Sequence, residues 1–310
     1  MEMSRPPLRC LVLDFFLQGN LPDADQHTLW HGALGNTLSR VSPSLFERLY
    51  GTAENHARLY SLVPPLPDYP RLRVTLTGDA CDGGLDITAT VKKIGRQGLG
   101  KERRCFTIHW AQYGARDPIP YYYGMNDETV EVPEACSITP DFFNQVIGHR
   151  NRMRFCTITP LILKEDNGLM AHPPTFSVLV RRLLGRISQI AHASNAALPY
   201  DEEQQRYWQM TATSVGLVSQ KIRMASFSRQ SKRTRHHMVF NGWEGTLEYA
   251  GPVAAFYSLF KLGEKLQLGG RTAFGFGAFQ TFWGRVDEGQ EPGLPVGSVC
   301  EEGDVQCGMC

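Results

Sequence analysis

The order of the local patterns constrains the fold of this chain most, because the same order occurs twice. In the first unit, residues 8–17 are rich in side chains that favour strands, and apolar residues in 29–41 recur at three- and four-residue spacing, which predicts a helix. A second short helix is predicted after Pro43. The remaining elements predicted in this unit are strands at 59–63, 72–76, 85–91 and 105–110 and a closing helix at 140–147.

The second unit has the same plan. Residues 152–163 predict a strand, 175–193 and 201–213 predict helices, and 222–227 and 238–249 predict strands, the latter as a hairpin bent at Asn241-Gly242. A helix at 253–262, between Pro252 and Gly263, and a strand at 278–283 complete it. Two such units predict an α+β fold of two tandem ferredoxin-like (RRM-like) modules, at 1–148 and 149–285.

The net charge hides an asymmetry that bears on the partner. The chain has 32 Lys and Arg against 31 Asp and Glu, and the resulting +1, taken alone, argues against a polyanionic partner. Residues 286–310, however, hold six acidic residues and no Lys or Arg, so the body carries +7. This division favours an anionic partner for the body and an acidic, flexible tail.

No segment predicts export or membrane insertion. The first apolar run, residues 8–17, is interrupted by Asp14, is too short to span a bilayer and is not followed by a small-residue cleavage site. No later segment reaches 18 apolar residues. We expect a cytoplasmic protein without a membrane partner, whose eight cysteines stay reduced.

Metal-ligand spacing is incomplete wherever it occurs. His27 and His31 are four residues apart, but Thr28 stands where a zinc protease needs Glu. Cys307 and Cys310 have the spacing of a zinc knuckle, yet only one further Cys lies nearby and no His completes a fourfold site. We therefore expect neither a metal nor another cofactor.

A glycine-rich stretch near the C-terminus is the most informative motif. Residues 262–277 read LGEKLQLGGRTAFGFG and lie between a predicted helix and a predicted strand. Four glycines in nine residues permit positive φ and close backbone approach, and exposed N–H groups with Arg271 suit a phosphate. The stretch is neither a Walker loop nor a dinucleotide fingerprint. A turn that needs glycine only for packing is the alternative.

Several segments, in order along the chain, resemble one family. The stretch at 253–277 is similar to the C-terminal signature of the RAMP superfamily of CRISPR-associated proteins. Segments 155–161, 174–187, 226–230 and 242–251 resemble the CRISPR precursor-RNA processing endoribonuclease. At the other end, 29–35 (LWHGALG) resembles the first helix of this family, and 95–106 resembles its internal glycine-arginine loop. The individual motifs are loose, and their order makes the resemblance specific.

The resemblance implies a metal-independent endoribonuclease that binds a CRISPR repeat RNA hairpin and cleaves precursor crRNA. In this reaction a ribose 2′-hydroxyl attacks the adjacent phosphate and leaves a 2′,3′-cyclic phosphate and a 5′-hydroxyl. It needs a base, an acid and a cation for the charge on the phosphate. Such an enzyme often retains the crRNA for an effector complex, so other CRISPR effector subunits are candidate partners.

Three residues are candidate catalytic groups. In one branch of the family the catalytic His follows the first helix, and an ungapped count from Gly32 puts Tyr50 at that position and His56 at a Lys position. Two interpretations stay open. Either the catalytic His is shifted to His56 in this chain, with Tyr50 as an auxiliary acid or orienting hydroxyl, or catalysis is weak or absent. His31, on the first helix, is the main competitor, although its neighbour Trp30 is equally compatible with a packed histidine.

Two basic clusters supply candidate RNA contacts. Residues 204–243 include seven basic and no acidic residues beside Phe227, and residues 92–104 carry six basic residues opposed only by Glu102. A solvated surface is the plain alternative for both clusters. With the glycine-rich stretch, the candidate RNA-binding residues are Arg103, Arg104, Arg229, Lys232, Arg233, Arg235, His236, Gly269, Gly270, Arg271, Gly275 and Gly277.

Two other classes of function compete with the enzyme. One is a non-catalytic RAMP-type subunit that binds crRNA in an effector complex. The other is a general RNA-binding ferredoxin-like protein outside CRISPR systems. Glycine-rich loops and basic strips serve all three classes, whereas a pair of proton-transferring groups serves only the enzyme.

Overall fold

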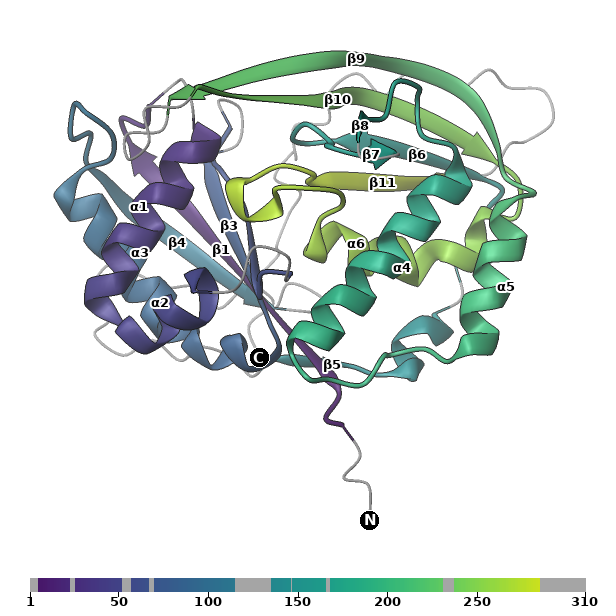
Figure 1. The fold of residues 1–310 in the computed structure, drawn as a ribbon, viewed down its shortest axis with the longest axis horizontal. Coiled ribbons are helices and arrows are strands. Elements are labelled where there is room, and N and C mark those ends of the chain that lie inside the picture. Colours follow the sequence, from purple (N-terminus) through teal and green to yellow (C-terminus); the bar gives the residue numbers. More distant parts are fainter. Residues whose placement is uncertain are drawn as a thin grey trace, which may run out of the picture.

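Two antiparallel sheets with the same strand order form the framework of the molecule (Figure 1). The computed structural model describes residues 5–22, 26–51, 57–66, 70–114, 135–145, 147–165, 168–230 and 237–284. The acidic tail predicted at 286–310 lies outside these residues.

The first sheet contains β1 (Leu8–Gly19), β2 (Tyr60–Val63), β3 (Arg71–Thr77) and β4 (Phe106–Gly114) in the order β2-β3-β1-β4. Its helices are α1 (Gln26–Val41) and α2 (Pro43–Tyr50), between β1 and β2, and α3 (Gly84–Gln97), between β3 and β4. A further short strand, β5 (Cys136–Ile138), pairs with the first residues of β1. This arrangement is a ferredoxin-like module in which β3 lies between β1 and β2.

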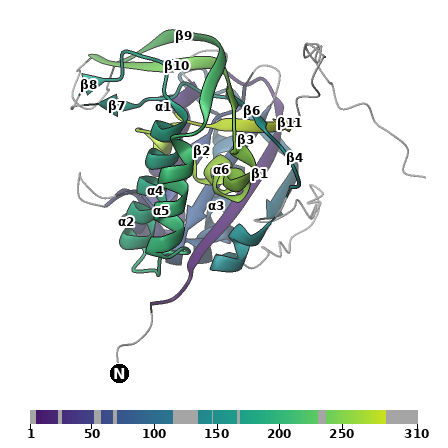
Figure 2. The same cartoon turned by 90° about the vertical axis from the view of Figure 1, so that its right-hand side faces the viewer.

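The second sheet repeats this topology. Its strands are β6 (Arg152–Thr157), β9 (Gly216–Gln230), β10 (His237–Ala250) and β11 (Phe279–Gly284), in the order β11-β6-β10-β9. Its helices are α4 (Phe176–Ala193), α5 (Glu202–Ala212) and α6 (Tyr257–Leu266), and α4 and α5 lie side by side (Figure 2). The predicted α+β fold of two tandem ferredoxin-like modules is confirmed. The short elements are β7 (Lys164–Glu165), β8 (Gly168–Leu169), η1 (Gly78–Gly83), η2 (Pro140–Asn144), η3 (Val253–Phe256) and η4 (Thr272–Phe274).

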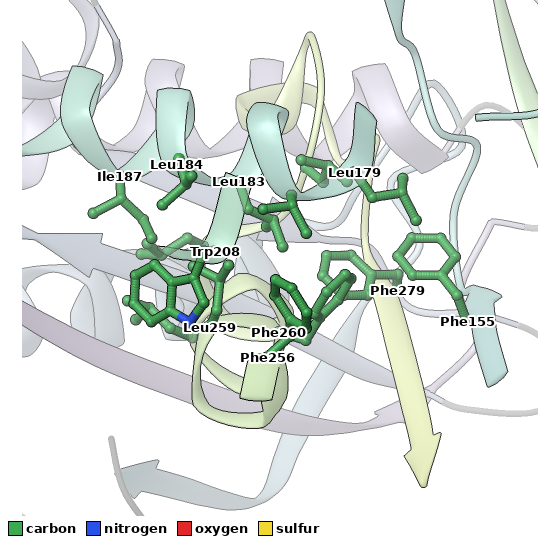
Figure 3. Packing of buried hydrophobic residues seen from close by; sticks show 14 of the residues in the cluster. Phe155, Leu179, Leu183, Leu184, Ile187, Trp208, Phe256, Leu259, Phe260 and Phe279 are labelled. Carbon is green, nitrogen blue, oxygen red and sulfur yellow. The ribbon is translucent and has the colours of Figure 1, made fainter. Parts of the chain in front are cut away.

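Helix α4 organises the core of the second module. It begins at Thr175, whose hydroxyl accepts the Val178 N–H and so satisfies one free backbone donor. Its apolar side chains, including Leu183 and Ile187, point toward α6 and β11 (Figure 3). Their spacing of three and four residues produces one continuous apolar face. Within the described residues, no helix is both long and apolar enough to cross a lipid bilayer.

Three predicted elements differ from the structure. The strand predicted at 85–91 is wrong, because these residues belong to α3, which buries Ile87, Val91 and Ile94 at helical spacing. β-branched residues favour strands, but here they tolerate a helix because tertiary burial dominates. The closing helix predicted at 140–147 is only the short η2, and the bend predicted at Asn241-Gly242 is absent because β10 continues through it.

Strands β9 and β10 form a long ribbon that extends beyond their sheet. They have 15 and 14 residues and pair along their whole length, whereas β6 pairs with β10 only from Thr246 to Ala250. At about 3.3 Å per residue the ribbon spans roughly 50 Å. It reaches from the second module to a position above α1 (Figure 1).

Strand β1 is buried on both faces and joins the two cores. Leu11, Leu13 and Phe15 pack in the core of the first module, under its helices. The alternate residues Leu8 and Cys10 belong to the core that contains α4 and α6. Because successive side chains of a strand point to opposite faces, this one strand fixes the two modules against each other.

Candidate active site

The glycine-rich loop, residues 269–277, lies between the two modules. Its short helix η4 packs against β2 and α1 of the first module. Just before the loop, the buried Gln267 donates from Nε2 to the Leu62 carbonyl of β2 at 2.9 Å. The loop is therefore held by contacts to both modules.

Glycine is required in this loop by backbone geometry. Gly269, Gly275 and Gly277 have φ of 85°, 95° and 80°, and a Cβ at Gly277 would run into the Leu268 carbonyl oxygen. The N–H groups of Gly270, Gly275 and Gly277 donate to the carbonyls of Ile162, Thr272 and Pro160, respectively. These three amides, which the sequence suggested as phosphate ligands, thus hold the loop together.

His31 contacts this loop from α1. Its Nδ1 lies 3.0 Å from the Ala273 carbonyl oxygen and 2.8 Å from the Tyr60 hydroxyl, and its ring stacks on Phe274 with centroids 3.9 Å apart. A carbonyl oxygen only accepts hydrogen bonds, so the contact with Ala273 is a hydrogen bond in the tautomer with its proton on Nδ1, where the Tyr60 hydroxyl oxygen is a second acceptor. In the neutral imidazole Nε2 is then the basic nitrogen.

Two tyrosines surround the same histidine. Tyr50, the last residue of α2, donates from its hydroxyl to the His31 carbonyl oxygen at 3.0 Å, and Tyr60 begins β2. Gly35 permits this arrangement, since a Cβ there would lie 2.6 Å from Tyr50 Cε1. Burial raises the pKa of both phenols well above the usual value near 10, so they stay neutral at physiological pH. This geometry suits Tyr50 as an orienting hydroxyl.

Arg271 places a positive charge beside this cluster. Its guanidinium carbon lies 5.6 Å from the ring centroid of Phe240 and 5.9 Å from that of Phe274, the ring that stacks on His31. The side chain is exposed, and within the described part of the chain it makes no ion pair. A cation held by two aromatic faces and open to solvent can contact a bound anion.

An aromatic cluster connects the ribbon to the loop. Phe240 of β10 packs on Phe276 of the loop with ring centroids 5.4 Å apart, and Phe227 of β9 lies 5.9 Å from Phe276. Ile162 completes this cluster. A two-stranded ribbon alone is marginally stable, so these contacts fix its position over the loop and α1.

The other sequence-predicted residues are not brought to His31 by the described structure. Arg103 and Arg104 lie on the loop between α3 and β4, where Arg104 pairs with Glu102 at 2.7 Å. Arg229 lies in β9, but its side chain is outside the described part. His56, Lys232, Arg233, Arg235 and His236 lie outside the described residues, and their roles stay predictions.

Sequence reasoning missed Tyr60 and Ala273. Tyr60 was covered only by the strand predicted at 59–63, although an aromatic residue with a polar tip at that position can reach a neighbouring helix. Ala273 acts through its carbonyl, which no residue type reveals. Among the described residues, no group of three His, Cys, Asp or Glu side chains is arranged to hold a metal ion.

Comparison with known proteins identifies the kind of domain that carries this loop. Residues 153–279 match the family model of the CRISPR-associated endoribonuclease Cas6, which confirms the resemblance drawn from the sequence motifs. No curated protein matches the sequence.

Solved Cas6 structures share the fold over nearly the whole chain. Cas6 of Thermus thermophilus has 18% sequence identity and a TM-score of 0.57, and the match covers 90% of this chain and 100% of that one. A Cas6 product complex has 17% identity and a TM-score of 0.57, covering 89% and 99% of the two chains. Another Cas6 product complex has 14% identity and a TM-score of 0.52, covering 89% and 99%. At these identities the similarity shows the fold.

Proposed function

We propose that this protein, whose second module carries a Cas6 domain, is an endoribonuclease that binds CRISPR repeat RNA and cleaves precursor crRNA once per repeat. The observation that carries the proposal is the contact of His31 with the glycine-rich loop. It joins a titratable imidazole from the first module to a loop from the second, beside an exposed arginine. Neither module alone contains this combination.

His31 is the proposed proton acceptor. With Nδ1 bonded to the Ala273 carbonyl, Nε2 removes the proton of the attacking 2′-hydroxyl. The 2′-oxygen forms a bond to phosphorus while the bond from phosphorus to the 5′-oxygen breaks. The products are a 2′,3′-cyclic phosphate and a 5′-hydroxyl, which takes up one proton. The reaction is a transesterification and consumes no co-reactant.

Other residues supply charge and orientation. Arg271 lies where a cation can balance the charge that develops on the non-bridging phosphate oxygens. Tyr50 and Tyr60 remain neutral and orient His31. His56 is retained as a candidate acid for the 5′-oxygen, because it lies between Tyr50 and Tyr60 in the sequence.

The proposed RNA contacts lie on the ribbon and on the loop after α3. The ribbon carries Lys221 and Arg223 in its described part and Arg229 in β9, and the sequence between β9 and β10 holds Lys232, Arg233, Arg235 and His236. Because A-form RNA hides its base edges in a deep groove, such basic strands bind through phosphates, shape and unpaired flanks. Solved structures similar to this chain include Cas6 product complexes and a partial Cas6-RT-Cas1–Cas2 complex, so other CRISPR proteins are proposed partners.

The test is single-turnover cleavage of labelled CRISPR repeat RNAs in EDTA. We expect His31→Ala to lower the rate by about 10²- to 10⁴-fold while the Kd for RNA stays within about threefold. The same RNA with a 2′-deoxyribose at the cut site is the control and should bind without being cleaved. His56→Ala, measured in parallel, compares the two histidines.

Each outcome has a distinct meaning. Sequence-specific binding without cleavage in any buffer would contradict the enzyme and favour a crRNA-binding subunit. Cleavage unaffected by His31→Ala but lost in His56→Ala would move the base to His56 and leave the function intact.

A further inference from the structure

Arg186, on α4, is a cation for which the described residues provide no counterion. Its Nη2 donates to Thr272 Oγ1 at 2.9 Å, and its Nε is buried with no hydrogen-bond partner. Burial lowers the pKa of this guanidinium to about 10, so it keeps its charge at neutral pH. The residue as a whole is half-buried, and the hydrogen bond to Thr272 offsets part of the cost of desolvating the guanidinium.

Helix packing alone does not explain an arginine here. The neighbouring positions on α4, Leu183 and Ile187, are buried and apolar and pack in the core (Figure 3). A half-buried position on α4 can also take a neutral side chain, which would avoid the cost of partly desolvating a charge. Among the described residues the guanidinium donates a hydrogen bond only to Thr272, so we look for its role in the glycine-rich loop.

Thr272 connects Arg186 to the proposed base. It is buried and begins η4, and the next residue, Ala273, accepts the His31 Nδ1–H through its carbonyl at 3.0 Å. The Thr272 carbonyl also accepts the Gly275 N–H at 3.0 Å, which closes the turn around Ala273. A shift of Thr272 therefore turns the carbonyl that orients the imidazole.

We propose that Arg186 is a positioning residue for RNA cleavage, which holds Thr272 and thereby keeps His31 in the orientation and tautomer that leave Nε2 as the base. The inference rests on the proposed function and assigns it a residue from a third element, α4. Arg186 acts through the loop, so its loss affects the cleavage step and not RNA affinity.

A double-mutant cycle on the single-turnover cleavage rate tests this role. Arg186→Met removes the charge and the donor at similar length, and Thr272→Val removes the acceptor at similar shape. We expect each to slow cleavage by about 10- to 100-fold, with the Kd for repeat RNA unchanged within about threefold. The double variant should be no slower than the slower single variant, because both break one contact. Thr272→Ser keeps the hydroxyl and is the matched control, expected within about threefold of wild type.

A second readout does not need cleavage. In ¹⁵N-detected NMR of the RNA-free protein, His31 should show the Nδ1-protonated tautomer, and Arg186→Met should show a mixture of tautomers. Additive losses in the cycle, or an unchanged rate in Arg186→Met, would overturn the positioning role. If the wild-type protein binds repeat RNA without cleaving it, the proposed function fails. The imidazole signal then decides the inference alone, and an unchanged Nδ1 proton in Arg186→Met would refute it.

Discussion

The two modules carry glycine- and arginine-containing loops at equivalent positions, yet only one of these loops contacts His31. Each loop follows the last α-helix of its module and precedes the edge strand that pairs with the first strand of that module. The loop after α3 contains Gly98 and Gly100, both with φ of 78°, and Arg103 with φ of 52°. The loop after α6 contains Gly269 with φ of 85° and Arg271 with φ of 63°. Similar backbone conformation therefore does not determine what each loop contacts.

The difference lies in what each loop bonds to. In the first loop, Leu99 and Arg104 exchange backbone hydrogen bonds of 2.8 and 3.0 Å, so the loop closes on itself at the surface. In the second, Gly270 and Gly277 donate to residues before α4, and η4 packs against the other module. The second loop becomes part of a site because it joins two surfaces.

The largest expected contrast is in stability. Gly277→Ala should lower the free energy of unfolding by roughly 3 kcal/mol, since it combines a positive φ with a clash against the Leu268 carbonyl. Gly100→Ala is the matched control, because its φ is also positive but the nearest atom to a Cβ lies 3.8 Å away. We expect a loss of about 1 kcal/mol there. Urea unfolding of both variants measures the contrast. Equal losses of unfolding free energy would show that close packing against the Leu268 carbonyl does not make the second loop more sensitive than the first.

The order of helices and strands was predictable from the sequence, whereas the contacts between the two modules were not. The helix at 175–193 was predictable, because the capping residue Thr175 precedes a regular apolar face. Residues 85–91 were wrongly predicted as a strand, because the β-branched side chains there fit a strand as well as a helix. His31 was recognisable as a titratable residue on a helix. Its contacts with Tyr60 and Ala273 depend on how two sheets pack, and a carbonyl partner leaves no trace in residue type.

The two loop arginines should separate cleavage from binding. Arg271→Gln should slow single-turnover cleavage by about tenfold, less than the loss typical of a buried donor, because the guanidinium is exposed. Arg103→Gln should leave the rate at saturation unchanged and weaken RNA binding by a factor of about three, with the salt slope reduced by about one. A rate loss in Arg103→Gln of the same size would make the two loops functionally equivalent.

The smallest expected effect concerns alkaline stability, where a tyrosine of each module is compared. Burial raises the pKa of Tyr200 to about 12, and that of Tyr60 is also raised. The neutral phenol is favoured in the folded state, so this stability is complete below pH 10 and is lost as the pH rises toward 12. At pH 11 the loss for Tyr200 is about 1 kcal/mol.

Unfolding free energies at pH 8 and pH 11 measure this loss. Tyr200→Phe and Tyr60→Phe should each show a smaller decrease between the two pH values than the wild type. A decrease unchanged in Tyr200→Phe would contradict the assigned cause for the second module, and the same result in Tyr60→Phe would do so for the first.

The two-sided burial of β1 has a consequence for biosynthesis. Leu8 and Cys10 are translated well before α4 and α6, which belong to the core that covers them. Until then the nascent first module exposes an apolar strip on one side of its central strand. A chain stalled before α6 is thus a natural client for chaperones that bind extended apolar segments.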